Sequence, residues 1–224
     1  MANTQGWWRI CAVFGVLTLA TFVGFSAQTV PSCGTVLAAP MIDFELATTR
    51  ANLAAVLDCQ PRLAELDRQN IVDLGFFMWV YVAFLAAFGR ASGVGLPIIA
   101  GIAALTLGGD LVETLRLRQI AAAWPQLGSD ALTPLIVASR LKFIAIGVGM
   151  ILSGMALFRR DPRVAARVVA ALAIIGGVGN FALLAGVPAT PAMLPTLISW
   201  LAILLFAAVS ALQPPLSVRA SPGA

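Results

Sequence analysis

The chain has 224 residues, of which 60% are hydrophobic and only 11% are charged. Soluble domains carry about 25% charged residues, so this composition, with a mean hydropathy of +0.94, excludes a soluble globular protein. The net charge of +4 would fit a nucleic-acid partner, but all but one of the 14 basic residues are arginines scattered along the chain. Orientation in a bilayer explains such a distribution better. We therefore expect a membrane protein with membrane lipids, and no nucleic acid, among its partners.

Six apolar segments follow one another with no soluble block between them. A spanning helix needs roughly 20 apolar residues, and the first segment lacks the A-x-A site of a cleaved signal peptide, which favours a retained anchor helix. We predict an all-α fold, a single polytopic membrane domain covering residues 1–224 with about six transmembrane helices. The spans are expected at residues 7–27, 71–89, 93–112, 141–158, 168–187 and 193–212.

The segment between the first two spans, residues 28–70, is expected to form a cap. Apolar and polar residues interleave over 42–57, a pattern typical of a short amphipathic helix lying on the membrane surface. Asp58 then marks a helix start, with Pro61 in the first turn, and this helix is expected to continue into the second span. Cys33 and Cys59 both lie in this segment and form either a disulfide or two unpaired thiols.

A cluster of arginines predicts the orientation of the helices. The short link between the fourth and fifth spans is the most basic part of the chain, opposed only by Asp161, and basic links stay in the cytoplasm. Its arginines are Arg159, Arg160, Arg163 and Arg167. Threading the other spans from this link places both termini in the cytoplasm and the cap outside. The Ala-, Arg- and Gly-rich composition is typical of high-GC bacteria, so we expect a bacterial inner membrane.

Charged residues at similar depths in several spans predict a polar pocket. Asp110, Glu113 and Leu117 share one face of a helix, and charge inside a membrane helix is costly unless it is paired or hydrated. With a rise of about 1.5 Å per residue, the predicted pocket lies roughly 20 to 25 Å from the inner face. Its walls are predicted to be Asp73, Asp110, Glu113, Lys142 and Asn180, with Arg116, Arg118 and Arg140 at the rim.

The same residues also fit a structural network with no ligand. In that interpretation Glu113 pairs with Arg116 on its own helix and Asp110 pairs with Lys142. Alternatively, Lys142 and Arg140 extend toward the headgroups. The functional interpretation is a site for a cation, a lipid headgroup or a small zwitterion, or a proton relay. Both interpretations remain open at this level.

Small residues indicate where the helices pack. Stripes of glycine, alanine and serine let membrane helices approach closely, so the third, fourth and fifth spans are expected to form the centre of the bundle. The stripes comprise Ala100, Ala104 and Gly108, then Ala145, Gly149 and Ser153, then Gly176, Gly177 and Gly179.

The sequence lacks the usual signatures of catalysis. It contains no histidine, no P-loop or dinucleotide motif, and no internal repeat of the transporter kind. We therefore expect no catalytic residue, no cofactor and no metal site, and predict a non-enzymatic accessory or structural subunit that docks on a larger membrane complex or on copies of itself. The alternative is a stand-alone ligand-handling protein, namely a lipid-active enzyme, carrier or receptor, with the outward-facing pocket.

Overall fold

The computed structural model describes residues 4–26, 33, 37, 39–128 and 130–213. It is 86% helix, with no strand among the described residues, which confirms the all-α fold. The helices are α1 (Thr4–Ser26), α2 (Pro40–Glu45), α3 (Arg50–Leu57), α4 (Gln60–Val72), the π-helix η1 (Asp73–Phe77), α5 (Met78–Ser92), α6 (Leu96–Ala123), α7 (Leu132–Arg160), α8 (Val164–Leu184) and α9 (Ala189–Leu212).

Six of the described helical segments are long and apolar enough to cross a membrane, as expected for a polytopic membrane protein. The second is one continuous helix, Gln60–Ser92, made of α4, η1 and α5, which confirms that the helix after the cap runs on into the second span. Two helices extend well beyond their predicted spans: α6 continues to Ala123, past the predicted span end near residue 112, and α7 begins at Leu132, before the predicted span start near residue 141.

The extra turns of α6 and α7 form because they have an apolar face to bury. Leu117 and Ile120 of α6 and Leu135 of α7 are buried in a cluster with residues of the cap. Polar residues on the opposite face do not break a helix whose other face is packed. The boundary between apolar and polar sequence therefore does not mark the end of the helix.

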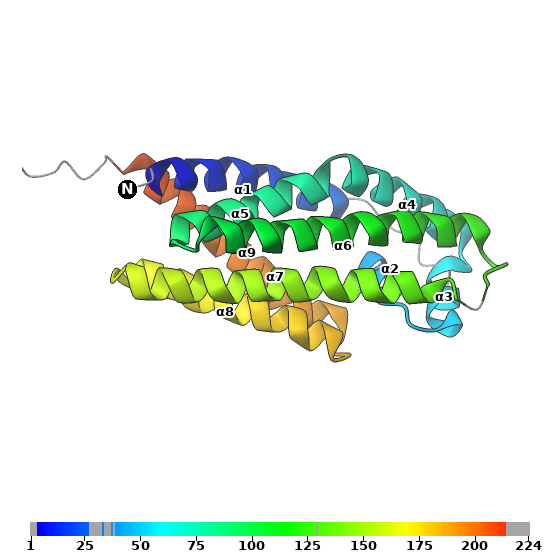
Figure 1. Ribbon diagram of the computed structural model, residues 1–224. Coiled ribbons are helices and arrows are strands. Elements are labelled where there is room, and N and C mark those ends of the chain that lie inside the picture. Colours follow the sequence, from blue (N-terminus) through cyan, green and yellow to red (C-terminus); the bar gives the residue numbers. More distant parts are fainter. Residues whose placement is uncertain (1–3, 27–32, 34–36, 38, 129, 214–224) are drawn as a thin grey trace, which may run out of the picture.

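At one end of the bundle some helices project further than the others (Figure 1). α1 packs against α5 and α9, α6 packs against α7, and α8 lies between α7 and α9. The start of α1 and the end of α9 lie at one end of the bundle, and α4, α6 and α7 project past the α8–α9 turn at the other. The cap helices α2 and α3 lie beside this projecting part.

The cap contains two short helices where the sequence predicted one. Thr49 begins α3 with a capping box, because its side chain accepts from the Asn52 backbone while the Asn52 side chain accepts from the Thr49 backbone. Asp58 ends α3, and the next helix begins after Cys59, one residue later than expected. Trp124, after α6, donates to the Asp58 carboxylate at 2.9 Å, which ties the cap to the transmembrane helices.

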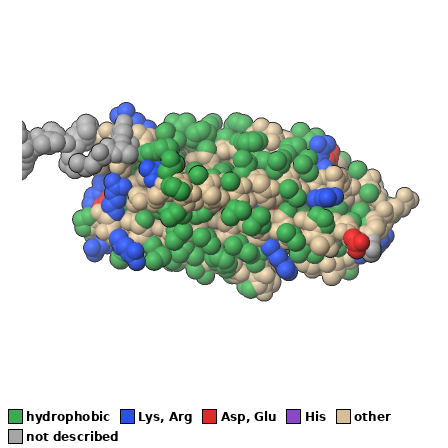
Figure 2. Space-filling view, in the orientation of Figure 1, with side chains coloured by type: hydrophobic (Ala, Val, Ile, Leu, Met, Phe, Trp, Pro, Cys, Tyr) green, Lys and Arg blue, Asp and Glu red, His purple; other side chains and the backbone are tan. Residues whose placement is uncertain are grey.

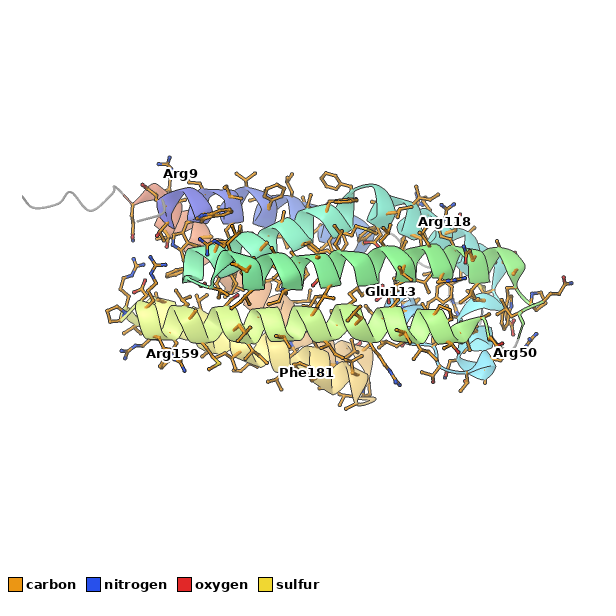
Figure 3. The ribbon with its side chains drawn as sticks, viewed as in Figure 1. Arg9, Arg50, Glu113, Arg118, Arg159 and Phe181 are labelled. Atoms are coloured by element: carbon orange, nitrogen blue, oxygen red, sulfur yellow. A yellow bond between two sulfur atoms is a disulfide. The ribbon has the colours of Figure 1, made fainter. Side chains whose placement is uncertain are left out.

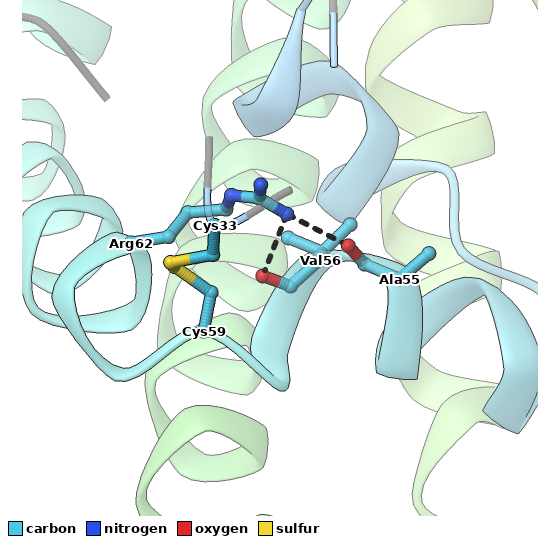
Figure 4. Close-up of a disulfide and its surroundings, with 5 residues drawn as sticks. All are labelled: Cys33, Ala55, Val56, Cys59 and Arg62. Atoms are coloured by element: carbon cyan, nitrogen blue, oxygen red, sulfur yellow. Dashed lines mark hydrogen bonds between the residues drawn. A yellow bond between two sulfur atoms is a disulfide. The ribbon is translucent and has the colours of Figure 1, made fainter. Parts of the chain in front are cut away.

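A disulfide joins Cys33 to Cys59, with Cα atoms 5.8 Å apart, so of the two alternatives the structure contains the bridge (Figure 4). Beside it, Arg62 is buried and its Nη1 donates to the backbone oxygen of Ala55 at 2.7 Å. A cation suits the carbonyl end of a helix such as α3. The bridge and this hydrogen bond both fix the junction between α3 and α4.

The small-residue prediction was right for two spans and wrong for one. The stripe on α7 is buried or half-buried, and Gly176, Gly177 and Gly179 of α8 are buried in contacts with α7 and α9. In α6, however, Ala100, Ala104 and Gly108 are exposed. The packed face of α6 instead contains Gly109, where an added Cβ would lie 3.0 Å from Ala138 O.

The two ends of the bundle differ in charge. Arginine side chains gather at the end where α1 starts, hydrophobic side chains cover the middle of the bundle, and both basic and acidic side chains lie toward the other end (Figure 2). Arg163 and Asp161 in the α7–α8 link form an ion pair at 2.6 Å. We call this the basic end. That it faces the cytoplasm stays a prediction of the positive-inside rule.

Candidate functional site

Lys142 of α7 is the centre of a buried charge cluster. Its Nζ donates to Glu45 Oε2 at 2.9 Å and to Asp110 Oδ1 at 3.2 Å, and it forms a third ion pair with Glu113. The side chains of Lys142, Asp110 and Glu113 are 6%, 3% and 0% exposed. Figure 3 places Glu113 between α6 and α7. Charges so deeply buried are stable only when they are paired.

A second set of hydrogen bonds extends the cluster toward α5 and η1. Tyr81 donates to Asp110 Oδ2 at 2.5 Å, and Thr114 donates to Asp73 Oδ2 at 2.9 Å. Asp73 is the first residue of the π-helix η1. Such insertions in an α-helix re-aim side chains and occur frequently at functional sites. Asp73 thus joins the group as a fourth carboxylate, although no described lysine or arginine pairs with it.

Local sequence explains how α6 and α7 deliver these side chains. The i, i+3, i+7 spacing of Asp110, Glu113 and Leu117 places all three on the buried face of α6, as predicted. Gly109 lies on the same face, and its missing side chain lets α6 approach the backbone of α7 at Lys142. The short carboxylates of α6 can therefore reach the ammonium of the facing helix.

Two members of the cluster were missed by the sequence analysis. Glu45 comes from the cap helix α2, and Tyr81 comes from the apolar span α5. Tyr81 is the only tyrosine in the sequence, and a lone tyrosine within a span is a usable signal for a buried hydrogen bond. Glu45 gave no such signal, because a glutamate on an amphipathic helix normally faces water.

The position of Glu45 perturbs its acidity. Burial raises the pKa of this carboxyl above its usual range, the nearby Lys142 ammonium opposes the rise, and the neighbouring Asp110 carboxylate adds to it. Part of the Glu45 population therefore holds a proton at a pH where an exposed glutamate would be ionised.

A cavity of about 530 Å³ lies against this cluster. Four predicted pocket residues, Asp73, Asp110, Lys142 and Asn180, line it together with Glu45. Glu113 does not line it and lies behind Lys142. Its remaining walls are mostly apolar and come from α1, the cap, η1, α5, α7 and α9, including Phe22, Phe25, Met41, Phe77, Tyr81, Phe143, Met193, Leu197 and Trp200.

Aromatic rings form one wall of the cavity in an unbroken series. Phe25 contacts Phe77, Phe77 contacts Tyr81, and Tyr81 stacks on Trp200, with ring centroids 5.3, 5.3 and 5.8 Å apart. The faces of aromatic rings attract cations. The aromatic wall and the carboxylates therefore both favour a positively charged group in the space between them.

Asn180 reaches the cavity from α8 through a separate network. Its amide nitrogen donates to Gly176 O at 2.9 Å and to Thr196 Oγ1 at 3.2 Å, and Thr196 donates to the same Gly176 oxygen. Asn180 and Thr196 both line the cavity. This network joins α8 to α9 and adds polar atoms that carry no charge.

The three predicted rim arginines do not line the cavity. Arg116 donates to Gln119 on its own helix, Arg118 pairs with Asp67 at 2.9 Å, and Arg140 is exposed. The expected pair of Glu113 with Arg116 was wrong, because Arg116 lies on the exposed face of α6 while Glu113 lies on the buried one. The expected pair of Asp110 with Lys142 is present.

The fold and the cavity thus define a multi-pass membrane protein with a buried, acid-lined pocket. No described set of three Asp, Glu, Cys or His side chains is placed to hold a metal ion. Comparison of the chain with protein-family models, curated proteins and solved structures finds no match. The function must therefore be argued from the chemistry of the pocket.

Proposed function

We propose that this protein is a ligand-handling membrane protein that binds an organic cation in the acid-lined cavity. The observation that carries the proposal is the charge balance of the cluster. Glu45, Asp73, Asp110 and Glu113 supply four carboxyl groups, and among the described residues Lys142 supplies the one cationic side chain that pairs with them. With all five groups ionised the formal charge is three negative, which a low-dielectric site does not hold without further positive charge or protons.

The cavity wall favours an organic cation over a hydrated inorganic one. Carboxylates and ring faces together bind ammonium groups in water-poor sites, whereas a hard metal ion requires several converging oxygens. The space of about 530 Å³ lies within the usual range of small-molecule pockets. The expected ligand is therefore an ammonium compound with an apolar body.

A binding experiment with benzyltrimethylammonium tests this proposal. The probe has a permanent charge, so it does not titrate, and calorimetry on the protein in nanodiscs measures its binding. We expect saturable binding by the wild-type protein. Failure of the wild-type protein to bind would overturn the proposal of a cation site.

Asp73→Asn is the most informative variant for this experiment. It replaces a carboxyl that pairs with no described lysine or arginine while keeping the shape and the oxygen that accepts from Thr114. We expect the probe's affinity to fall at least tenfold with thermal stability unchanged or raised. The matched control is Asp67→Asn, which neutralises an aspartate paired with Arg118 and outside the cavity. Equal losses in both variants would contradict a specific role for the cavity.

A second candidate function, the accessory or structural subunit, is supported by the outer face of α6. Ala100, Ala104 and Gly108 are exposed there, and a stripe of small residues is the usual contact surface for another membrane helix. Native mass spectrometry on gently extracted protein separates the candidates. A lone chain carrying a small cationic ligand supports the first candidate, and recovery only within a larger assembly supports the second.

The proposed setting is a bacterial inner membrane, with the basic end in the cytoplasm and the cap outside. The arginines of the α7–α8 link support this orientation through the positive-inside rule. The disulfide between Cys33 and Cys59 supports it independently, because such bonds persist outside the reducing cytoplasm. In this setting the cavity lies in the outer half of the bilayer.

A further inference from the structure

A groove between α1 and α9 lies next to the cavity. It has a volume of about 240 Å³, and Phe84 of α5 and Trp200 contribute to its walls. Leu19, Ile198 and Leu201 in its walls are 40%, 47% and 46% exposed. Because α1 and α9 both span the membrane, exposed apolar side chains on these helices face lipid. The groove is therefore open to the bilayer.

The groove and the acid-lined cavity share part of their walls. Phe22, Leu197 and Trp200 line both spaces. Trp200 also stacks on Tyr81, whose hydroxyl donates to Asp110. A ligand that passes Trp200 thus leaves the carboxylates on one side and enters a mostly apolar environment on the other.

The lining of the groove suits a hydrocarbon chain and nothing polar. Its one hydroxyl, on Thr18, already donates to Phe14 O at 2.8 Å. Gly15 lies at the far end, where an added Cβ would approach Leu204 Cδ1 to 2.8 Å. From Gly15 to Phe22 the groove follows α1 for about 10 Å, which accommodates an alkyl chain of medium length.

We infer that the ligand is a membrane-borne amphiphile whose ammonium head lies among the carboxylates and whose hydrocarbon chain lies in the groove between α1 and α9. This inference rests on the proposed cation site and adds the ligand class and the route of entry. Entry is lateral, from the bilayer, because the groove opens to lipid and the cavity continues from it. The groove determines where the chain lies and adds little affinity, since lipid tails are as apolar as its walls.

Photo-crosslinking locates the chain directly. The probe is dodecyltrimethylammonium with a diazirine at the end of its chain, added to the protein in nanodiscs, irradiated and mapped by peptide mass spectrometry. We expect labels on residues 15–22 and 197–204 at least fivefold above those on α6. Benzyltrimethylammonium should compete for this labelling, and the same chain with a neutral hydroxyl head should label all lipid-facing helices alike.

Leu201→Trp tests the groove without touching the charge cluster. It fills the groove from an exposed position, so labelling of the two segments should fall at least fivefold while binding of benzyltrimethylammonium stays unchanged. Leu105→Trp is the matched control, because Leu105 is 50% exposed on α6 and lines none of the cavities described above.

The outcomes separate this inference from the proposed function. If benzyltrimethylammonium binds but the long probe labels every helix equally, or Leu105→Trp matches Leu201→Trp, the groove inference is wrong and the cation site stands. If benzyltrimethylammonium itself fails to bind, the proposed function falls, and the groove inference falls with it.

Discussion

The ion pairs of Arg163 in the α7–α8 link and of Lys142 on α7 show how strongly burial determines what an ion pair contributes to stability. At the basic end, Arg163 pairs with Asp161 while 47% of the arginine side chain stays exposed. In the cluster, Lys142 is 6% exposed and contacts three carboxylates from two other helices. The first pair is a surface contact that water and salt screen. The second is an obligatory pairing, because its members are almost wholly buried and a charge left unpaired there is costly.

This difference predicts the largest mutational effect in the protein. Lys142→Met leaves the carboxylates of Asp110, Glu113 and Glu45 buried without their cation, and breaking a buried pair in this way costs about 3–5 kcal/mol. We expect a large fall in the unfolding temperature or loss of folded protein, measured by thermal unfolding and size-exclusion chromatography after extraction.

The control for that prediction is Arg163→Met at the basic end. The exposed pair contributes about 0–1 kcal/mol, so this variant should unfold close to the wild-type temperature. Adding Asp110→Asn and Glu113→Gln to Lys142→Met should recover much of the lost stability, because it removes two of the three unpaired charges. A Lys142→Met protein as stable as Arg163→Met would mean that the cluster is hydrated and not buried.

The disulfide provides a further comparison of the buried cluster with the basic end, because only the buried cluster takes one of its carboxylates from the cap. Glu45 reaches Lys142 from α2, and the Cys33–Cys59 bridge closes a loop with a sequence separation of 26. Replacing both cysteines by serine should lower the unfolding free energy by about 3 kcal/mol in the chain-entropy model. Hydrogen exchange should increase in α2 and α3 and not in the α7–α8 link.

Reduction of the wild-type protein is the matching control for the cysteine variant. Dithiothreitol should destabilise the wild-type protein to the level of the double serine variant and leave that variant unchanged. Cys11 is buried within α1 and remains present in both proteins. An unchanged melting temperature after complete reduction would show that packing alone fixes the cap.

The sequence predicted the parts of this fold that depend on local pattern. Hydrophobic length located all six spans, and helical periodicity placed Asp110 and Glu113 on one face, because both follow from spacing along a single helix. The bridge between Cys33 and Cys59 was one of two stated alternatives.

The predictions that were wrong concern which helices pack against each other. Nothing within α6 indicates that Gly109, and not the stripe containing Ala104 and Gly108, is the face that meets α7. Glu45 was missed for the same reason, since its partner lies 97 residues away in sequence. Pairing between distant segments depends on the assembled packing, which periodicity in one segment does not encode.

The smallest predicted effect is the pH dependence contributed by two carboxyl groups, Glu45 in the buried cluster and Asp161 at the basic end. Their contributions to the free energy of unfolding should change with pH in opposite directions, which tests the comparison between the two regions most sharply. Burial raises the pKa of Glu45, with Lys142 opposing the rise and Asp110 adding to it. A raised folded-state pKa gives a contribution to stability that is complete below the unfolded pKa and is lost as the pH rises through the folded value. The free energy of unfolding of the wild-type protein relative to Glu45→Gln should therefore fall as the pH rises above the usual glutamate range.

Asp161 should show the reverse, because hydrogen bonds from Arg163 lower its pKa. Its contribution is complete above the unfolded pKa of about 3.8 and is lost as the pH falls through the lower folded value. Unfolding free energies of wild type, Glu45→Gln and Asp161→Asn, measured from acid to neutral pH, give both differences. Each change should be smaller than the loss of the disulfide. Slopes of the same sign would show that the ion pair with Lys142 outweighs the burial of Glu45, and the buried cluster would then lose its contrast with the basic end.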